Sequence, residues 1–107
     1  MVQQKILCIC RAGANRSRTL SEMLNKMGFN ADFSGLSNAV EKLADAHIVI
    51  FMEMDHLNYA NAFYSDSIKD KNVYCLRVPD NYDYNEPKLK TLLMRRMKET
   101  DILITKI

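Results

Sequence analysis

A short segment near the start of the sequence combines a nucleophile, a cation and a turn suited to binding anions. Cys10 and Arg16 are separated by five residues, and Ser17 follows the arginine directly. An apolar run precedes this segment and a helical pattern follows it, so the cysteine is expected at a turn from strand to helix. Backbone N–H groups in such a turn and the N-terminus of the helix favour negative charge at one point. The same field favours the thiolate of Cys10, and the guanidinium of Arg16 matches the oxygens of a phosphate.

The elements that must position this segment alternate between strand and helix. Apolar runs predict strands at 5–10, 29–34, 47–52 and 73–78, and helical spacing predicts helices at 17–27, 38–45, 55–64 and 87–98. The alternation predicts an α/β fold, with three layers (α/β/α) around a four-stranded parallel sheet and right-handed crossovers. Residues 101–107 fit either a short strand or a tail.

The expected sheet brings two distant polar segments together. Ligands of open parallel sheets bind beyond the carboxyl ends of the strands. Cys10 stands at such an end, and so does the loop 79–86, which is rich in Asp, Asn and Tyr. We therefore expect the cysteine and a carboxylate of this loop to lie at the same edge of the sheet, where they could act together.

Size, composition and charge favour one soluble domain spanning residues 1–107. A chain of 107 residues can build one layered core and is too short for two. Its net charge of +2 gives no reason to expect nucleic-acid binding, and no apolar run approaches the roughly 18 residues of a membrane span. No signal-peptide pattern opens the sequence. Nucleic acid and membrane are therefore not among the expected partners.

The three cysteines argue against a disulfide framework and for a reducing compartment. Cys8 and Cys10 lie in one strand, and we expect their side chains on opposite faces of it. Cys8 and Cys75, which lie within apolar strands, are expected in the core. No second Cys/His pair has the spacing of a zinc site, so neither a metal nor another cofactor is expected. The cytoplasm is the expected location.

The sequence resembles the low-molecular-weight protein tyrosine phosphatases, most closely their short microbial relatives of about this length. The resemblance covers nearly the whole chain and is carried by the segments 5–10, 16–27, 33–36, 50–56 and 75–82. It implies the family's flavodoxin-like topology and a hydrolysis that uses no cofactor. The Cys-x5-Arg-Ser segment becomes specific when it is joined to the late acidic loop in a chain of this length.

The resemblance also implies roles for particular residues. Cys10 matches the nucleophile, Arg16 the phosphate-binding arginine, and Ser17 the hydroxyl that supports the thiolate. Asp80 matches the general acid, and Tyr82 matches an aromatic residue at the wall of the substrate pocket. The residues that would hold the phosphate are Arg11, Ala12, Gly13, Ala14, Asn15, Arg16 and Ser17.

Three positions depart from the family's pattern. In larger relatives a proline follows the acid directly, whereas here it precedes Asp80, which leaves Asp83 as the alternative acid. Asp80 is favoured because it comes first after the strand and keeps the Asp-x-Tyr spacing. Gly13 stands where relatives often have an asparagine that braces the loop, and Asn15 would take over part of that bracing. Arg11 occupies a rim position of the substrate pocket that is often apolar, where a second cation would favour substrates with another negative charge.

The resemblance implies hydrolysis of phosphate monoesters, with phosphotyrosine in proteins as the first expectation. A phosphorylated protein or a small phosphate ester would be the partner, inorganic phosphate the product, and a monomer the working form. The main alternative is a IIB-type phosphocarrier of a sugar phosphotransferase system, phosphorylated on Cys10, because its loop also reads Cys-x-Ala-Gly. An arsenate reductase and a non-catalytic phosphate-binding relative are further alternatives. Arg16 and the loop around Asp80 favour the hydrolase, and the missing redox cysteines disfavour the reductase.

Overall fold

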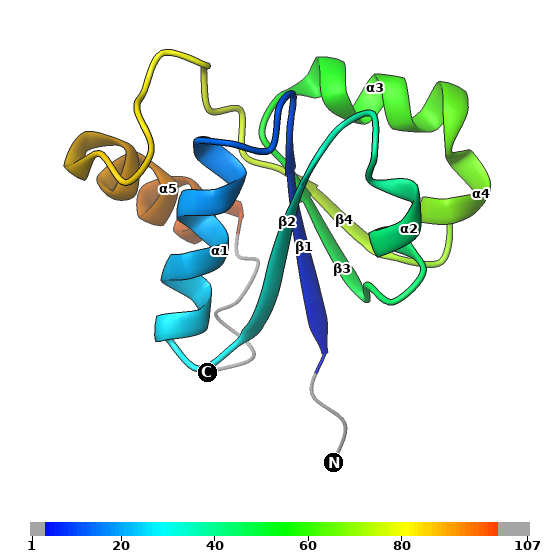
Figure 1. Cartoon of the computed structure of the whole chain (residues 1–107), viewed down its shortest axis with the longest axis horizontal. Helices are drawn as coiled ribbons and strands as arrows, with labels where there is room; N and C mark the ends of the chain where they lie inside the picture. The colour runs from blue at the N-terminus through cyan, green and yellow to red at the C-terminus, as the bar shows by residue number, and fades with distance from the viewer. Residues whose placement is uncertain (1–3, 101–107) are drawn as a thin grey trace.

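A four-stranded parallel β-sheet forms the centre of the structure, a computed structural model that describes residues 4–100 (Figure 1). The elements in chain order are β1 (Lys5–Cys10), α1 (Arg16–Lys26), β2 (Asn30–Gly35), α2 (Val40–Leu43), β3 (Ile48–Phe51), α3 (Met54–Phe63), α4 (Ser65–Ile68), β4 (Asn72–Cys75) and α5 (Pro87–Thr100). The strand order is β2-β1-β3-β4, and each pair of neighbours is parallel. The predicted α/β fold is confirmed.

Helices cover both faces of the sheet, which makes the three predicted layers (Figure 1). On one face, α1 and α5 bury a cluster that consists of Ile6, Cys8, Cys10, Leu20, Leu24, Ile48, Ile50, Met52, Leu76, Val78, Leu89, Leu93 and Met97. On the other face, α2, α3 and α4 cover Leu7, Ile9, Leu36, Ala39, Leu43, Ala46, Val49, Phe51, Ala60 and Ile68. Successive side chains of a strand point to opposite faces, so the apolar strands β1 and β3 supply both clusters.

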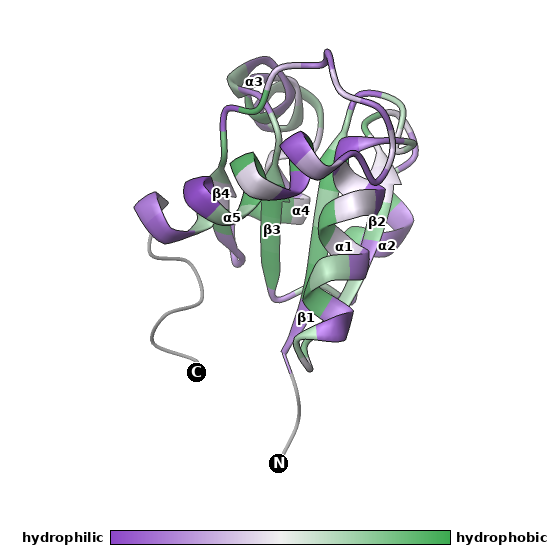
Figure 2. Ribbon diagram, turned by 90° about the vertical axis from the view of Figure 1, so that its left-hand side faces the viewer, coloured by the Kyte–Doolittle hydropathy of each residue, from purple (hydrophilic) through white to green (hydrophobic). Residues whose placement is uncertain are grey.

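The polarity of the elements matches this layering. Figure 2 shows hydrophobic residues concentrated in β1 and β3, whereas the surrounding helices also carry hydrophilic residues. Each fully buried leucine or isoleucine contributes about 1.5–3 kcal/mol relative to an exposed one, so these two clusters hold the layers together. Within the described part of the chain, no helix combines the length and the apolar character needed to cross a membrane.

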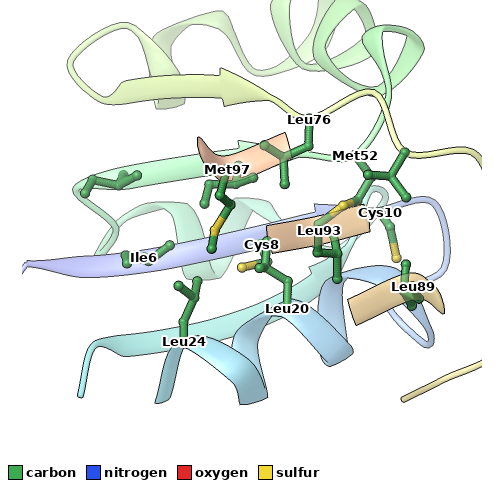
Figure 3. Close-up of a cluster of buried hydrophobic side chains, with 13 residues drawn as sticks. Ile6, Cys8, Cys10, Leu20, Leu24, Met52, Leu76, Leu89, Leu93 and Met97 are labelled. Carbon is green, nitrogen blue, oxygen red and sulfur yellow. The ribbon is translucent and has the colours of Figure 1, made fainter. Parts of the chain in front are cut away.

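The prediction that Cys8 and Cys10 face opposite sides of their strand is wrong. Both side chains lie with Ile6 in the cluster under α1 and α5 (Figure 3). Side chains alternate along a strand, so residues two positions apart share a face. Cys8 is fully buried, as predicted for a core residue, and burial raises the pKa of its thiol, with a further contribution from Cys10. Cys75 is only half-buried, and all three cysteines are free.

The predicted helix at 38–45 is shorter in the structure. Only one turn of it forms a helix, α2, which ends where the N–H of Ala46 donates to the carbonyl oxygen of Leu43. The helix predicted at 55–64 is present as α3, and beyond Tyr64 one further helical turn, α4, forms that was not predicted. The prediction for 101–107 lies outside the described residues.

The predicted strand at 73–78 is shorter in the structure because of one residue. β4 ends at Cys75, and Arg77 has a left-handed backbone with φ 58°. The chain still follows β3 past this point, since the N–H groups of Leu76 and Val78 donate to main-chain carbonyls at and beyond its end. The loop 79–86 therefore starts at the carboxyl edge of the sheet.

The strand order creates a switch point at the carboxyl ends of β1 and β3. From β1 the chain crosses to β2 on one side, and from β2 it returns to β3 on the other side of β1. Loops that part in this way leave a crevice in which open parallel sheets bind their ligands. Cys10 is the last residue of β1. Glu53 lies two residues beyond the end of β3, directly after Met52. In Figure 1 the yellow segment after β4 passes over the end of α1 that is nearest this edge before it enters α5.

Candidate active site

The cysteine at the end of β1 has two polar partners. Cys10 Sγ lies 3.0 Å from Ser17 Oγ, and the backbone N–H of Gly13 donates to the same sulfur with an N···S distance of 3.2 Å. Cys10 is only 2% exposed and Ser17 is fully buried. A thiolate at this position would accept hydrogen bonds from both groups, and charge-assisted hydrogen bonds are stronger than neutral ones.

Residues 10–16, here called the Cys10 loop, are packed tightly against the end of β2. Gly13 has a left-handed backbone with φ 71°, and a Cβ atom at this position would lie 2.4 Å from the backbone nitrogen of Gly35. Only glycine therefore fits without a shift of the main chain. Direct contact between two stretches of backbone therefore fixes the loop at this position.

Several N–H groups of the Cys10 loop are available to an anion. Within residues 4–100, the amides of Ala12, Ala14 and Asn15 donate no hydrogen bond to a protein acceptor. The first turn of α1 carries no acidic side chain, and Asn15, its N-cap, makes no capping hydrogen bond. A helix N-terminus carries about half a positive charge. The loop and the helix together therefore favour an anion next to Cys10.

The Arg16 side chain is buried and is held by two oxygens. Its Nη1 donates to Glu53 Oε2 and to the carbonyl oxygen of Val78, each at 2.6 Å, and the residue is 1% exposed. Its Nε is buried and has no hydrogen-bond partner among the described residues. The carboxylate oxygen Oδ1 of Asp80 lies 3.6 Å from this nitrogen. A buried N–H without a partner costs about 1–3 kcal/mol, so an oxygen of a bound anion would be stabilised at this position.

Glu53 and His56, at the start of α3, extend this network. The hydrogen bond from Arg16 lowers the pKa of Glu53, so its carboxylate form is favoured. His56 is fully buried, and its Nε2 lies 3.6 Å from Glu53 Oε2. Neither ring nitrogen of His56 has a hydrogen-bond partner among the described residues. Burial lowers the pKa of His56, although Glu53 opposes this effect, so the imidazole is neutral at neutral pH.

The structure brings Asp80 to the Cys10 loop and leaves Asp83 in a turn. The side chain of Asp80 is 57% exposed, and its carboxylate faces Arg16 as described above. The backbone of Asp83 instead forms the turn before α5, where its N–H donates to Glu86 Oε1 and its carbonyl accepts from the N–H of Glu86. Between the two candidate acids, the geometry favours Asp80.

The two predicted residues of the substrate pocket lie on different sides of the site. Arg11 is exposed, and its charge contributes to the lowered pKa values of Glu53 and His56, so it lies toward β3 and α3. The ring of Tyr82 packs against the cluster under α5. It lines a groove of about 330 Å³ with Pro87, Lys88, Thr91, Leu92 and Arg95. Arg11 is not among the residues that line this groove.

Asn15 braces a different contact from the one expected. Its Nδ2 donates to the carbonyl oxygen of Tyr82 at 3.2 Å. The side chain thus ties the loop 79–86 to the Cys10 loop instead of stabilising the Cys10 loop internally. A second groove, of about 340 Å³, is lined by Glu53, Met54, Asp55, Arg77, Val78 and Pro79.

Sequence reasoning missed Glu53 and His56 as parts of the site. Their positions did carry an indication, because Glu53 follows an apolar strand at the sheet edge where Cys10 also lies. A buried arginine needs a carboxylate partner, and residues beyond strand ends are the natural source. His56 then follows at i+3, which is the same face of a helical turn.

The site has to be interpreted from its own geometry. Comparisons of this chain with models of known protein families, with curated proteins and with solved structures found no match. Among residues 4–100, no group of three or more His, Cys, Asp or Glu side chains is placed to hold a metal ion. The site combines a buried thiol beside a hydroxyl and a backbone N–H, a buried guanidinium whose Nε has no hydrogen-bond partner among the described residues, and an exposed carboxylate beside that guanidinium. This set can hold a tetrahedral oxyanion against a nucleophile and supply a proton to a leaving group.

Proposed function

We propose that the chain is a cysteine-dependent phosphatase of the low-molecular-weight protein tyrosine phosphatase type, which hydrolyses phosphate monoesters. One observation carries the proposal: the buried, unpaired Nε of Arg16 lies beside Asp80 at the sheet edge where Cys10 ends β1. A phosphate group bound there would meet a nucleophile, a cation and a proton donor at once. The donors around Cys10 Sγ add to this support.

In the first step the Cys10 thiolate attacks phosphorus in line with the ester oxygen. An S–P bond forms as the P–O bond to the leaving group breaks, and protonated Asp80 transfers its proton to that oxygen. In the second step water attacks the thiophosphate while ionised Asp80 accepts a proton from it. The S–P bond breaks, inorganic phosphate leaves, and the thiolate is restored. The reaction can proceed in two steps because Cys10 holds the phosphate between them and Asp80 acts as the acid in the first step and as the base in the second.

Most of the rate would come from charge stabilisation around the transferred group. Phosphoryl transfer spreads negative charge over three equatorial oxygens, and N–H donors fixed in advance stabilise it without reorganisation. The loop amides, the N-terminus of α1 and Arg16 are such donors. Glu53 and the Val78 carbonyl restrain the guanidinium through Nη1, which leaves Nε for an oxygen of the substrate.

The proposed substrates are phosphorylated proteins, with phosphotyrosine first, and small phosphate esters second. The proposed working form is a monomer. Because the reaction needs a reduced thiolate, a reducing compartment such as the cytoplasm suits it.

A phosphocarrier is the second candidate function, and one observation favours it. The sequence Cys10-Arg11-Ala12-Gly13 fits the loop of IIB-type carriers, and Gly13 is required here by close packing. A carrier would keep its phosphate on Cys10 until a sugar accepts it. A phosphatase would lose the phosphate to water within one turnover.

The proposal can be tested by hydrolysis of two esters: p-nitrophenyl phosphate, and phenyl phosphate, whose leaving phenol is less acidic. The wild-type chain should turn over both substrates, and Cys10→Ser should abolish turnover. Asp80→Asn should lower kcat for the phenyl ester by about 10²-fold or more, because that leaving group needs the proton. Asp83→Asn is the matched control and should stay near wild type. Normal turnover by Cys10→Ser, or a stable phosphorylated cysteine in the wild type, would overturn the proposal.

A further inference from the structure

The loop 79–86, here called the acid loop, is fastened to α1 by contacts outside the Cys10 loop. The hydroxyl of Tyr84 donates to Glu22 Oε1, and the guanidinium of Arg18 lies 4.3 Å from the centre of the Tyr84 ring. The N–H of Asn85 donates to Thr19 Oγ1 at 2.9 Å. These contacts join segments that are more than sixty positions apart in the sequence.

The three partners on α1 form one attachment surface. Glu22 follows Arg18 by four positions and Thr19 by three, and residues at these spacings lie on one side of a helix. Thr19 is 1% exposed, so its contact with Asn85 is sheltered from water. Asn85 has a left-handed backbone with φ 64°, a conformation that asparagine tolerates better than most residues. The acid loop therefore turns at Asn85 directly above its anchor.

The protonation states agree with this attachment. The hydrogen bond from Tyr84 lowers the pKa of Glu22, and the same bond raises the pKa of the Tyr84 hydroxyl. At neutral pH a carboxylate thus accepts a hydrogen bond from a neutral phenol. The positive charge of Arg18 lies close to both partners.

The contacts of the Asp80 side chain hold it only weakly in place. Its carboxylate is 57% exposed, and its contact with Arg16 Nε is 3.6 Å long. A general acid must come within hydrogen-bond distance of the leaving oxygen, and a misplacement of about 1 Å can cost 10²-fold in rate. The restraint must therefore come from elsewhere in the acid loop.

We infer that the contacts of Tyr84 with Glu22 and of Asn85 with Thr19 form a latch that positions Asp80 over Cys10. The physical basis is a shared support: α1 begins with Arg16 and Ser17, so the helix that carries the anion site also carries the anchor of the acid. Tyr84 and Thr19 are positioning residues, since they act through Asp80. The inference depends on the proposed function, because Asp80 is an acid only in that reaction.

Two substitutions test the latch through the leaving group. Tyr84→Phe removes the hydroxyl but keeps the ring, and Thr19→Val removes the acceptor at nearly constant volume. With phenyl phosphate, whose leaving group needs a proton, each variant should lower kcat by about tenfold at unchanged KM. With p-nitrophenyl phosphate, whose leaving group needs no proton, kcat should change less than about twofold. Thr19→Ser keeps an acceptor oxygen and should restore the wild-type dependence.

Tyr59→Phe on α3 is the matched control, because Tyr59 is 38% exposed and Tyr84 is 37% exposed. This control should match the wild type with both esters. Equal losses on both esters, or no loss on either, in the latch variants would overturn the inference.

Amide hydrogen exchange separates the latch from the proposed function. If the latch exists, exchange at the Asn85 N–H should accelerate in Thr19→Val and recover in Thr19→Ser, whether or not the chain hydrolyses phosphate esters. If the wild type hydrolyses none of the esters, the proposed function fails. Exchange that is identical in all variants contradicts the latch on its own.

Discussion

At the scale of single residues, the conformation of the Cys10 loop depends most on one glycine, Gly13. Gly13 donates its N–H to Cys10 Sγ, and this requires a left-handed backbone pressed against Gly35 of β2. Any larger residue would move the N–H away from the sulfur or push β2 aside. The position that departs from the phosphatase pattern in sequence is therefore explained by geometry.

Gly13→Ala should lower the free energy of unfolding by at least ~2 kcal/mol, because a left-handed alanine costs about 1–2 kcal/mol and overpacking about 1–3 kcal/mol more. Urea unfolding measures the change. Gly28→Ala is the matched control: Gly28 also has a positive φ, of 96°, but an added Cβ would meet nothing within 4 Å. Equal destabilisation by both substitutions would show that the contact with Gly35 is unimportant.

Substitution of Arg11 tests whether a positive charge at the rim of the proposed substrate pocket favours substrates with a second negative charge. If it binds a second negative charge, Arg11→Leu should lower kcat/KM for a phosphopeptide with acidic neighbours by roughly two- to fivefold relative to a neutral one, as expected for an exposed ion pair of up to ~1 kcal/mol. Added salt should shrink the wild-type preference in the same way. Lys69→Leu, which removes an exposed cation at the C-terminal end of α4, should leave the ratio unchanged. An unaltered ratio in Arg11→Leu would remove the hypothesis.

At the scale of elements, the junction of β3 and α3 completes the site that β1 and α1 begin. Glu53 lies just past β3 and restrains Arg16 from the first turn of α1, so the two strand ends are joined by an ion pair. His56, one turn into α3, lies under that pair without a hydrogen-bond partner among the described residues. The groups around its ring are Glu53 and Asp55 from its own junction, and Arg16 and Arg11 from the Cys10 loop.

His56 should make stability depend on pH. Burial lowers its pKa in the folded state below 6.5, so below that pH the unfolded chain binds more protons and is favoured. The free energy of unfolding should therefore fall as pH decreases from about 7.5 to 5.5, and His56→Asn should flatten this slope. Urea titrations at several pH values provide the measurement, and parallel curves for wild type and His56→Asn would contradict the prediction.

At the scale of the whole molecule, three segments that lie far apart in the chain meet at one edge of the sheet. The Cys10 loop, the β3–α3 junction and the acid loop are joined by Arg16 and by α1. The two apolar clusters hold these supports in place on both faces. Any anion that binds all three segments should therefore stabilise the entire fold.

Inorganic phosphate should raise the Tm of the chain, because a ligand that binds only the folded state stabilises it. At a concentration of about 100 times Kd the gain is ~2.7 kcal/mol. Calorimetry in phosphate and in chloride at equal ionic strength isolates specific binding from screening. Arg16→Lys should lose most of the phosphate-dependent shift, since a lysine cannot reproduce the restrained guanidinium. A Tm that is the same in both salts would argue against an anion site at Cys10.

The amino-acid sequence alone determined the parts of this protein that local patterns encode. The apolar runs and helical spacing predicted all four strands and the order of layers, and β1 was predicted residue by residue. Cys10 and Ser17 meet because a strand-to-helix turn brings neighbours in the chain together. The failures were also local: α4 and the early end of β4 depend on single backbone angles at Tyr64 and Arg77 that composition does not reveal.

Only the tertiary structure decided which distant groups share the site. Arg16 and Glu53 are 37 positions apart, and the sequence alone does not specify that the carboxylate beyond β3 pairs with this particular arginine. The approach of Asp80 to Arg16, the position of Tyr82 beside α5 and the burial of His56 follow from the path of the chain across the sheet. The physical reason is that side-chain periodicity specifies which face of an element is buried, whereas the strand order β2-β1-β3-β4 specifies what that face and its loops meet.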